Sequence, residues 1–397
     1  MAKPGTALEV LSVFLKLGLT SFGGPVAHLG YFRTAIVGKH RWMDERAYAE
    51  LVALCQFLPG PASSQVGIGI GLTRAGPLGA LAAWTGFTLP SALLMLAFAF
   101  SLSTLEEAFG TGWMHGLKLA AVAVVAQAVW AMARSLTPDK QRLSLALAVT
   151  AFLLFWDSPW DQMVAMLIGA GLGLIFYRKR KIETDGGALT VPIGKRFAIA
   201  CFLIFLALLG LLPLLAWIFP DQTLALISAF YRSGSLIFGG GHVVLPLLES
   251  SVVGPGWISE TDFLAGYGAA QAVPGPLLSF SAFLGAAMEP RPNGLLGGAL
   301  ALLAIFLPSF LLVFAALPFW QLLRRRPAMQ AAMMGVNAAV VGLLLAALYD
   351  PVFLAGVREP RDFAIAAVAL LLLEGWRVPP WLVVLLSAVA GALLTGT

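Results

Sequence analysis

Residues 16–26 read KLGLTSFGGPV, and residues 232–242 repeat the pattern as RSGSLIFGGGH. A second motif follows each of them, QFLPGP at 56–61 and QAVPGP at 271–276. Each copy therefore carries a cation, a Phe-Gly-Gly motif and a Pro-Gly-Pro motif in the same order. Composition alone rarely preserves such an order, so the sequence predicts an internal duplication.

The composition is that of a membrane protein. The chain is 59% hydrophobic and only 11% charged, whereas soluble domains carry roughly 25% charged residues. Residues 198–218 form one of several apolar runs near the ~20 residues that cross a bilayer. The lysines and arginines lie between such runs, which is typical of topology signals and not of nucleic-acid binding. We expect an all-α polytopic membrane protein.

The apolar segments number thirteen, and the duplication extends through them. Residues 76–79 match 294–297, and the Pro-Ser pair at 90–91 matches 308–309. Seven segments precede the second copy, and an odd number of crossings inverts its orientation. The sequence therefore predicts two homologous halves of inverted topology. The expected units are a first membrane repeat 1–177, a cytoplasmic basic linker 178–196, a connecting transmembrane helix 197–219 and a second, inverted repeat 220–397.

The basic residues favour one form of this topology. If every segment crosses, the 22 lysines and arginines outside apolar segments divide 15 to 7 between the two sides. If the first two segments of each copy are re-entrant hairpins, bent at the Phe-Gly-Gly and Pro-Gly-Pro motifs, the division is 19 to 3. The second division fits the positive-inside rule better. It places the N-terminus and the linker in the cytoplasm and the C-terminus on the outer side of the membrane. The topology in which every segment crosses remains an alternative.

The interrupted segments have the chemistry of an anion site. Pro-Gly-Pro cannot continue a helix, and the freed backbone groups must face a cavity and not lipid. A helix that starts after the break points its amides and its positive dipole end at that cavity. The residues expected at the site are Gly23, Gly24, Gly239, Gly240, Pro59, Gly60, Pro61, Pro274, Gly275 and Pro276, with the hydroxyl donors Ser63, Ser64 and Ser279.

Three cations lie inside apolar segments. Lys16 and Arg232 occupy equivalent positions before the Phe-Gly-Gly motifs, and Lys118 has the neutral Asn337 as its equivalent. A buried cation is costly and is a functional candidate by default, so these side chains would supply charge to the substrate. The alternative for Lys16 and Arg232 is that they extend to the membrane interface.

Two glutamines and two histidines lie near the breaks. Gln56 and Gln271 each precede their Pro-Gly-Pro motif by three residues, where they would bond freed carbonyls or contact substrate. His28 and His242 are not at equivalent positions, and we interpret them as packed side chains and not as a proton relay. Catalytic and nucleotide-binding motifs are not recognisable, so we expect neither an enzyme, a cofactor nor a metal.

The motif residues resemble the chromate ion transporter family, specifically its long two-domain bacterial members. The resemblance rests on FGGP at 22–25, Trp42 with Glu45 and Tyr48, QFLPGP, and their second copies, and it covers essentially the whole chain. The second copy departs from it with Gly241-His242 in place of Pro25-Val26.

Membership implies export of chromate, with sulfate as a similar dianion, across the bacterial cytoplasmic (inner) membrane. We expect alternating access with one dianion held between the halves. The alternatives are a sulfate or other oxyanion permease, an anion channel and a membrane-embedded reductase. The lipid bilayer is the expected partner, nucleic acid is not, and a homodimer is left open.

Overall fold

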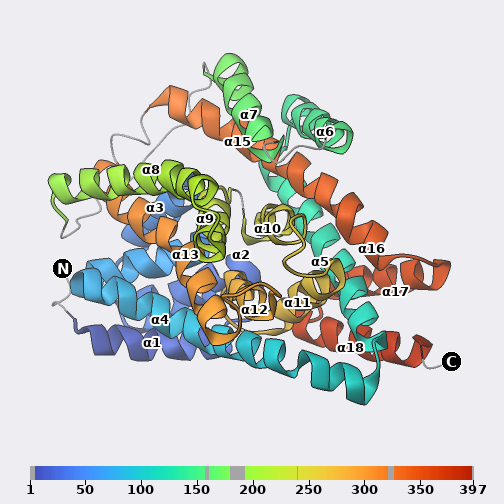
Figure 1. The fold of residues 1–397 in the computed structure, drawn as a ribbon. Coiled ribbons are helices and arrows are strands. Elements are labelled where there is room, and N and C mark those ends of the chain that lie inside the picture. The colour runs from blue at the N-terminus through green and yellow to red at the C-terminus, as the bar shows by residue number, and fades with distance from the viewer. Residues whose placement is uncertain (1–4, 157–160, 179–192, 239, 321–325, 396–397) are drawn as a thin grey trace.

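The computed structural model describes residues 5–156, 161–178, 193–238, 240–320 and 326–395, and every regular element in these ranges is a helix (Figure 1). Five helical segments are long and apolar enough to cross a membrane: Ala62–Phe109, Gly112–Leu136, Lys195–Ile218, Gly294–Phe319 and Pro327–Gly356. The expectation of an all-α, multi-pass membrane protein is confirmed.

Helices end at both motifs in each half of the chain. The first half begins with α1 Ala7–Thr20, α2 Gly24–Phe32, α3 Glu45–Phe57 and α4 Ala62–Phe109. The corresponding helices of the second half are α9 Gln222–Ser235, α10 Val244–Val252, α11 Glu260–Ala272, α12 Phe280–Ala287 and α13 Gly294–Ala316. Helix α4 leaves helical geometry at Ala75 and Gly76, where the second half separates α12 from α13.

Capping residues at equivalent positions explain where several of these helices begin. Thr6 accepts a hydrogen bond from an amide in the first turn of α1, as Asp221 does for α9. Asp44 caps α3 in the same way, and Ser259 caps α11. A side-chain oxygen at this position satisfies an amide that has no partner within the helix, so the local sequence sets the start of each helix.

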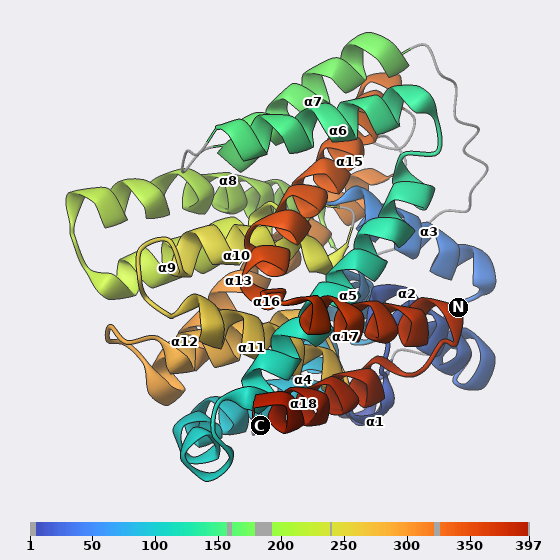
Figure 2. The same ribbon diagram turned by 90° about the vertical axis from the view of Figure 1, so that its right-hand side faces the viewer.

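The two halves exchange their terminal helices. The first half continues with α5 Gly112–Leu136, α6 Lys140–Phe155 and α7 Asp161–Tyr177; the second continues with α15 Pro327–Ala347, α16 Leu354–Gly356, α17 Pro360–Leu370 and α18 Pro380–Thr395. Helix α5 packs against α17 and α18, while α15 packs against α6 and α7 (Figure 2). The halves are therefore interlocked and not merely adjacent.

Small residues permit this exchange. Gly116 of α5 approaches the backbone at Ser387 of α18, and Gly335 of α15 approaches the backbone of α7 at Gly169. Gly116 and Gly335 are the glycines matched in the sequence repeat, and small side chains let helices approach closely in a membrane. Helix α8, Lys195–Ile218, lies between the halves in sequence and packs on α9 and α13. Most of the predicted linker 178–196 falls outside the described residues.

Candidate functional site

Reciprocal backbone hydrogen bonds join the two halves at their breaks. The amide of Gly60, in the first Pro-Gly-Pro, donates to the carbonyl oxygen of Ile237 at 2.6 Å. The amide of Gly275, in the second, donates to the carbonyl oxygen of Ser21 at 2.9 Å. Ile237 and Ser21 each stand immediately before a Phe-Gly-Gly motif. The Pro-Gly-Pro break of each half is therefore attached to the Phe-Gly-Gly break of the other.

Glycine is required at these two joints. Gly275 has φ +104°, and a Cβ there would lie 2.9 Å from Ser91 Oγ on α4. Gly60 has φ +124°, and a Cβ there would lie 3.0 Å from Ser309 Oγ on α13. Ser91 and Ser309 belong to the matched Pro-Ser pairs, so each break also packs on the other half's long helix.

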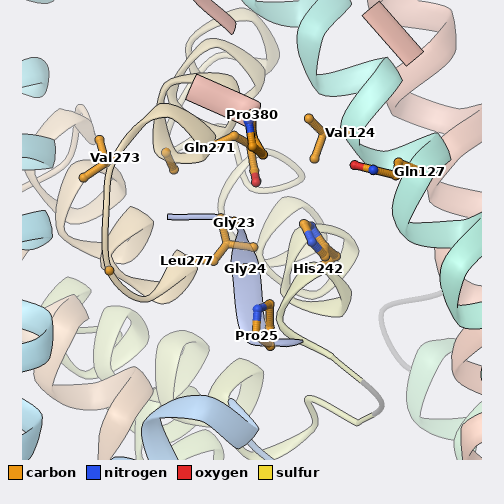
Figure 3. Close-up of a pocket in the computed structure, with 12 residues that line it drawn as sticks. Gly23, Gly24, Pro25, Val124, Gln127, His242, Gln271, Val273, Leu277 and Pro380 are labelled. Carbon is orange, nitrogen blue, oxygen red and sulfur yellow. The ribbon is translucent and has the colours of Figure 1, made fainter. Parts of the chain in front are cut away.

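A small cavity opens where the first Phe-Gly-Gly motif meets the second Pro-Gly-Pro motif, and we call it the junction pocket (Figure 3). Its volume of about 70 Å³ exceeds the roughly 10–15 Å³ that one water molecule needs by the same measure. A small polyatomic ion fits this space. The lining residues are Gly23, Gly24, Pro25, Val124, Gln127, His242, Ala270, Gln271, Val273, Gly275, Leu277 and Pro380.

Hydrogen-bond donors converge on the junction pocket. Helix α2 begins there at Gly24, without a side-chain cap, after Gly23 and Gly24 adopt φ +100° and +79°. Pro25, the second residue of α2, has no N–H, so the donors that the helix start offers to an anion are the amide of Gly24 and those that follow Pro25, together with the positive dipole end. The Nε2 atom of Gln271 is buried and makes no hydrogen bond of standard geometry among the described residues, although the Gln271 side chain interacts with the Tyr267 hydroxyl. A buried donor without a good hydrogen bond costs about 1–3 kcal/mol, which a bound oxyanion would offset.

His242 adds an imidazole to the pocket wall. Its Nδ1 lies 2.8 Å from the hydroxyl oxygen of Tyr267, a fully buried side chain of α11. The contact fixes the orientation of the ring, which Figure 3 shows beside Gly24. His242 therefore lines the candidate site, although the sequence favoured a packed side chain.

The predicted cations are not brought together. Lys16 lies on the exposed face of α1, while its neighbours Leu17 and Gly18 face the protein. Arg232 lies 3.4 Å from Ser251 Oγ, beside a different cavity of about 10 Å³. Lys118 lines a third cavity. Among the described residues, neither lysine nor arginine lines the junction pocket, so its charge complementarity comes from amides and a helix dipole.

The equivalent glutamines have different environments. Gln271 lines the junction pocket, whereas Gln56 is exposed. The carbonyl oxygen freed at the first break, that of Pro59, instead accepts a 2.6 Å hydrogen bond from Gln65 Nε2. Gln65 lies in the first turn of α4, where the second half has no glutamine. The carbonyl freed at the first Pro-Gly-Pro is therefore hydrogen-bonded by the helix that follows it, whereas the second Pro-Gly-Pro faces the pocket.

The remaining predicted residues do not line the junction pocket. Pro61, Ser63, Ser64, Pro274, Pro276 and Ser279 are buried, Gly240 is half-buried, and Gly239 falls outside the described residues. The lining residues that the sequence reasoning missed are Pro25, Val124, Gln127, His242, Ala270, Val273, Leu277 and Pro380. Gln127 offered a signal, because it is an amide inside the apolar helix α5. Its Nε2 donates to Glu374 Oε2 at 3.3 Å.

Comparison with known proteins identifies the family. A family model described as "Chromate transporter" matches residues 8–174 and again residues 224–392. The chain belongs to the chromate transporter family. The two matches begin in α1 and α9 and end in α7 and α18, and α8 lies between them.

Similar full-length proteins carry the same description. The chain is 27% identical over 375 residues to a chromate transport protein of Pseudomonas aeruginosa, covering 93% of this chain and 87% of that one. It is 27% identical over 407 residues to a probable chromate transport protein of Synechococcus elongatus, with 98% and 96% coverage. A chromate transport protein of Cupriavidus metallidurans is 28% identical over 350 residues, with 86% and 82% coverage. Solved structures give no match.

Proposed function

We propose that this chain is a secondary transporter that exports chromate from the cytoplasm across the bacterial cytoplasmic membrane. The observation that carries the proposal is the junction pocket, in which the uncapped start of α2 and the side chain of Gln271, whose Nε2 makes no hydrogen bond of standard geometry, line one small cavity. Chromate is a tetrahedral dianion, and such donors suit an oxyanion. The family and the names of the relatives support chromate as the substrate.

Two features support inverted halves with re-entrant hairpins. At 1.5 Å per residue, the 14-residue α1 and the 13-residue α3 extend about 21 and 20 Å, and α2 with its direct helical continuation Arg33–Lys39 extends at most about 24 Å. Each is shorter than the ~30 Å hydrocarbon layer. The reciprocal hydrogen bonds at Gly60 and Gly275 are what a two-fold relation between the halves requires. An axis in the membrane plane would put the breaks near mid-membrane.

The position of the pocket supports the proposal of alternating access. Its walls come from α2 in the first half and from the α11 break in the second, so a movement of one half against the other would reshape it. In this structure the first Pro-Gly-Pro is closed by Gln65 while the second one lines the pocket. Export requires a second arrangement in which access is reversed, and the repeat supplies equivalent elements for it.

The test is counterflow of radiolabelled chromate into proteoliposomes containing the purified protein. Chromate inside the vesicles should accelerate uptake of labelled chromate several-fold, because a carrier returns faster when loaded. Uptake that does not respond to chromate inside would refute alternating access and support an anion channel. Stronger exchange with sulfate than with chromate would make the chain a sulfate permease. Membrane potential and pH gradient, varied separately in inverted vesicles, would identify the driving force.

A further inference from the structure

A second, larger cavity lies at the N-terminal end of α5, and we call it the Lys118 cavity. Its volume is about 470 Å³. The titratable side chains that line it are His115, Lys118, Arg358, Glu359, Arg361 and Asp362. They come from the start of α5 and from the turn that leads into α17, two segments brought together by the exchange of helices between the halves (Figure 2). The proposed function does not use this cavity.

Lys118 is the unusual residue of this cavity. Lys118 is only 4% exposed, yet among the described residues its Nζ has one hydrogen-bond partner, Thr261 Oγ1 at a long 3.5 Å. An ammonium carries three donors, and burial without a counter-charge is costly. Among the described residues, carboxylates do not come within 4.0 Å of Nζ. The equivalent Asn337 is neutral, so the charge belongs to one half only and is not a requirement of the helix packing.

The acidic residues of the cavity do not cancel this charge. Asp362 Oδ1 lies 2.7 Å from His115 Nε2, and Asp362 Oδ2 accepts the amides of Arg358 and Glu359 at 2.9 and 3.1 Å. Both carboxylate oxygens of Asp362 therefore already have hydrogen-bond partners. Glu359 is exposed at the rim of the cavity, and its single negative charge is outnumbered by the positive charges of the exposed Arg358 and Arg361. Asp362 and Arg358 also act on Lys118 electrostatically, with opposite signs, and Glu260 and Asp262 act on it from the start of α11 without lining the cavity.

The Lys118 cavity is separate from the junction pocket. Both are lined by α5, but Lys118 and Gln127 are about 14 Å apart along the helix axis. Between them Ala120 packs in an apolar cluster with Ala265 of α11 and Val384 of α18, and Ala123 packs in another with Ala369 of α17 and Val383 of α18. Gly268 of α11 also approaches the backbone of Leu117 closely. An anion in one cavity therefore does not touch the residues of the other.

We propose that the Lys118 cavity is a second binding site for the transported oxyanion, on the outer side of the membrane. The side follows from the hairpin topology, which leaves Arg291, Arg358 and Arg361 as the three outer basic residues outside apolar segments. Two of these three line the cavity. Lys118 and Arg361 hold the anion after it leaves the junction pocket. The identity of the anion rests on the proposed function.

The test is equilibrium binding of radiolabelled chromate to the full-length protein in lipid nanodiscs. Wild type should bind two chromate ions per chain, and Lys118→Gln with Arg361→Gln should bind one. Arg291→Gln removes one positive charge from the same side, outside the cavity, as the matched control for Arg361→Gln, and should bind two. Arg361→Gln alone alters only an exposed rim residue and should weaken the second site about two- to fivefold. That single variant keeps the test valid if the double variant fails to fold.

The outcomes separate this inference from the proposed function. Unchanged stoichiometry and affinity in the Lys118→Gln/Arg361→Gln variant would overturn the second site. Gln271→Leu should retain the Lys118 cavity and bind one chromate ion. If wild type binds a single ion that is lost only in Gln271→Leu, the second site is refuted and the junction pocket stands. If the single ion is lost only in the Lys118 variant, the second site stands and the junction pocket is refuted.

Discussion

Gly275→Ala tests the joint between the halves most sharply. A side chain at φ +104° costs about 1–3 kcal/mol in backbone strain. The new Cβ would also lie 2.9 Å from Ser91 Oγ and 3.2 Å from the carbonyl oxygen of Phe87, and overpacking of this kind costs about 1–3 kcal/mol more. We expect a total loss of about 2–6 kcal/mol in the free energy of unfolding, together with loss of chromate counterflow.

Gly256→Ala is the matched control for this prediction. Gly256 also has a positive φ, +74°, but a Cβ there meets nothing within 4 Å. It should therefore lose only the strain energy, about 1–2 kcal/mol. The difference between the two variants isolates the close approach of the second break to α4. Thermal unfolding in nanodiscs at one scan rate measures both variants.

A second substitution tests the contact itself. Ser91→Gly in the Gly275→Ala background removes the nearest clashing atom and should restore part of the stability, while the Phe87 carbonyl still limits the recovery. Ser91→Gly alone should cost about 0.5–1 kcal/mol as a helix-interior glycine. If Gly275→Ala unfolds at the same temperature as Gly256→Ala, or if Ser91→Gly gives no recovery, the proposed packing at this joint is refuted.

Three further predictions concern residues outside the junction pocket. Gln65→Leu leaves the buried carbonyl of Pro59 without its 2.6 Å hydrogen bond and should destabilise the protein by about 1–3 kcal/mol in thermal unfolding; an unchanged midpoint would exclude this role. Trp320→Phe removes the 2.7 Å hydrogen bond from Nε1 to Glu50 Oε2 and should cost about 1.5–3 kcal/mol, whereas a loss below 0.5 kcal/mol would contradict it. Lys16→Gln changes an exposed side chain and should keep at least about half of the chromate counterflow rate; complete loss would return Lys16 to the site.

The sequence predicted the features that depend on local chemistry. Helices end beside the Phe-Gly-Gly and Pro-Gly-Pro motifs because proline and glycine act on their own backbone. The positive φ angles at Gly60 and Gly275 are local in the same sense, because glycine adopts them without strain. The sequence repeat matches Gly116 with Gly335, and the two glycines have the same role in the structure. Each lets a long helix pack closely on a helix from the other half.

The features that the sequence could not predict depend on contacts between the halves. Lys16 and Arg232 are equivalent in sequence, but one faces outward and the other borders a small cavity, because helical phase and neighbouring helices decide where a side chain points. Gln56 and Gln271 differ for the same reason. The exchange of α6 and α7 for α17 and α18 is a long-range arrangement. It places Lys118 in a separate cavity, whereas the sequence predicted Lys118 at the same substrate site as the two motifs.

The central claim is that chromate is held in the junction pocket, and the pair Gln271 and Gln56 tests it directly. These glutamines precede equivalent Pro-Gly-Pro motifs, but only Gln271 lines the pocket. Chromate counterflow should fall about tenfold or more in Gln271→Leu, since a hydrogen bond to a charged group contributes about 1.5–3 kcal/mol. The same rate should change less than about twofold in Gln56→Leu, since exposed substitutions have small effects. Equal losses in both variants, or a larger loss in Gln56→Leu, would contradict the account.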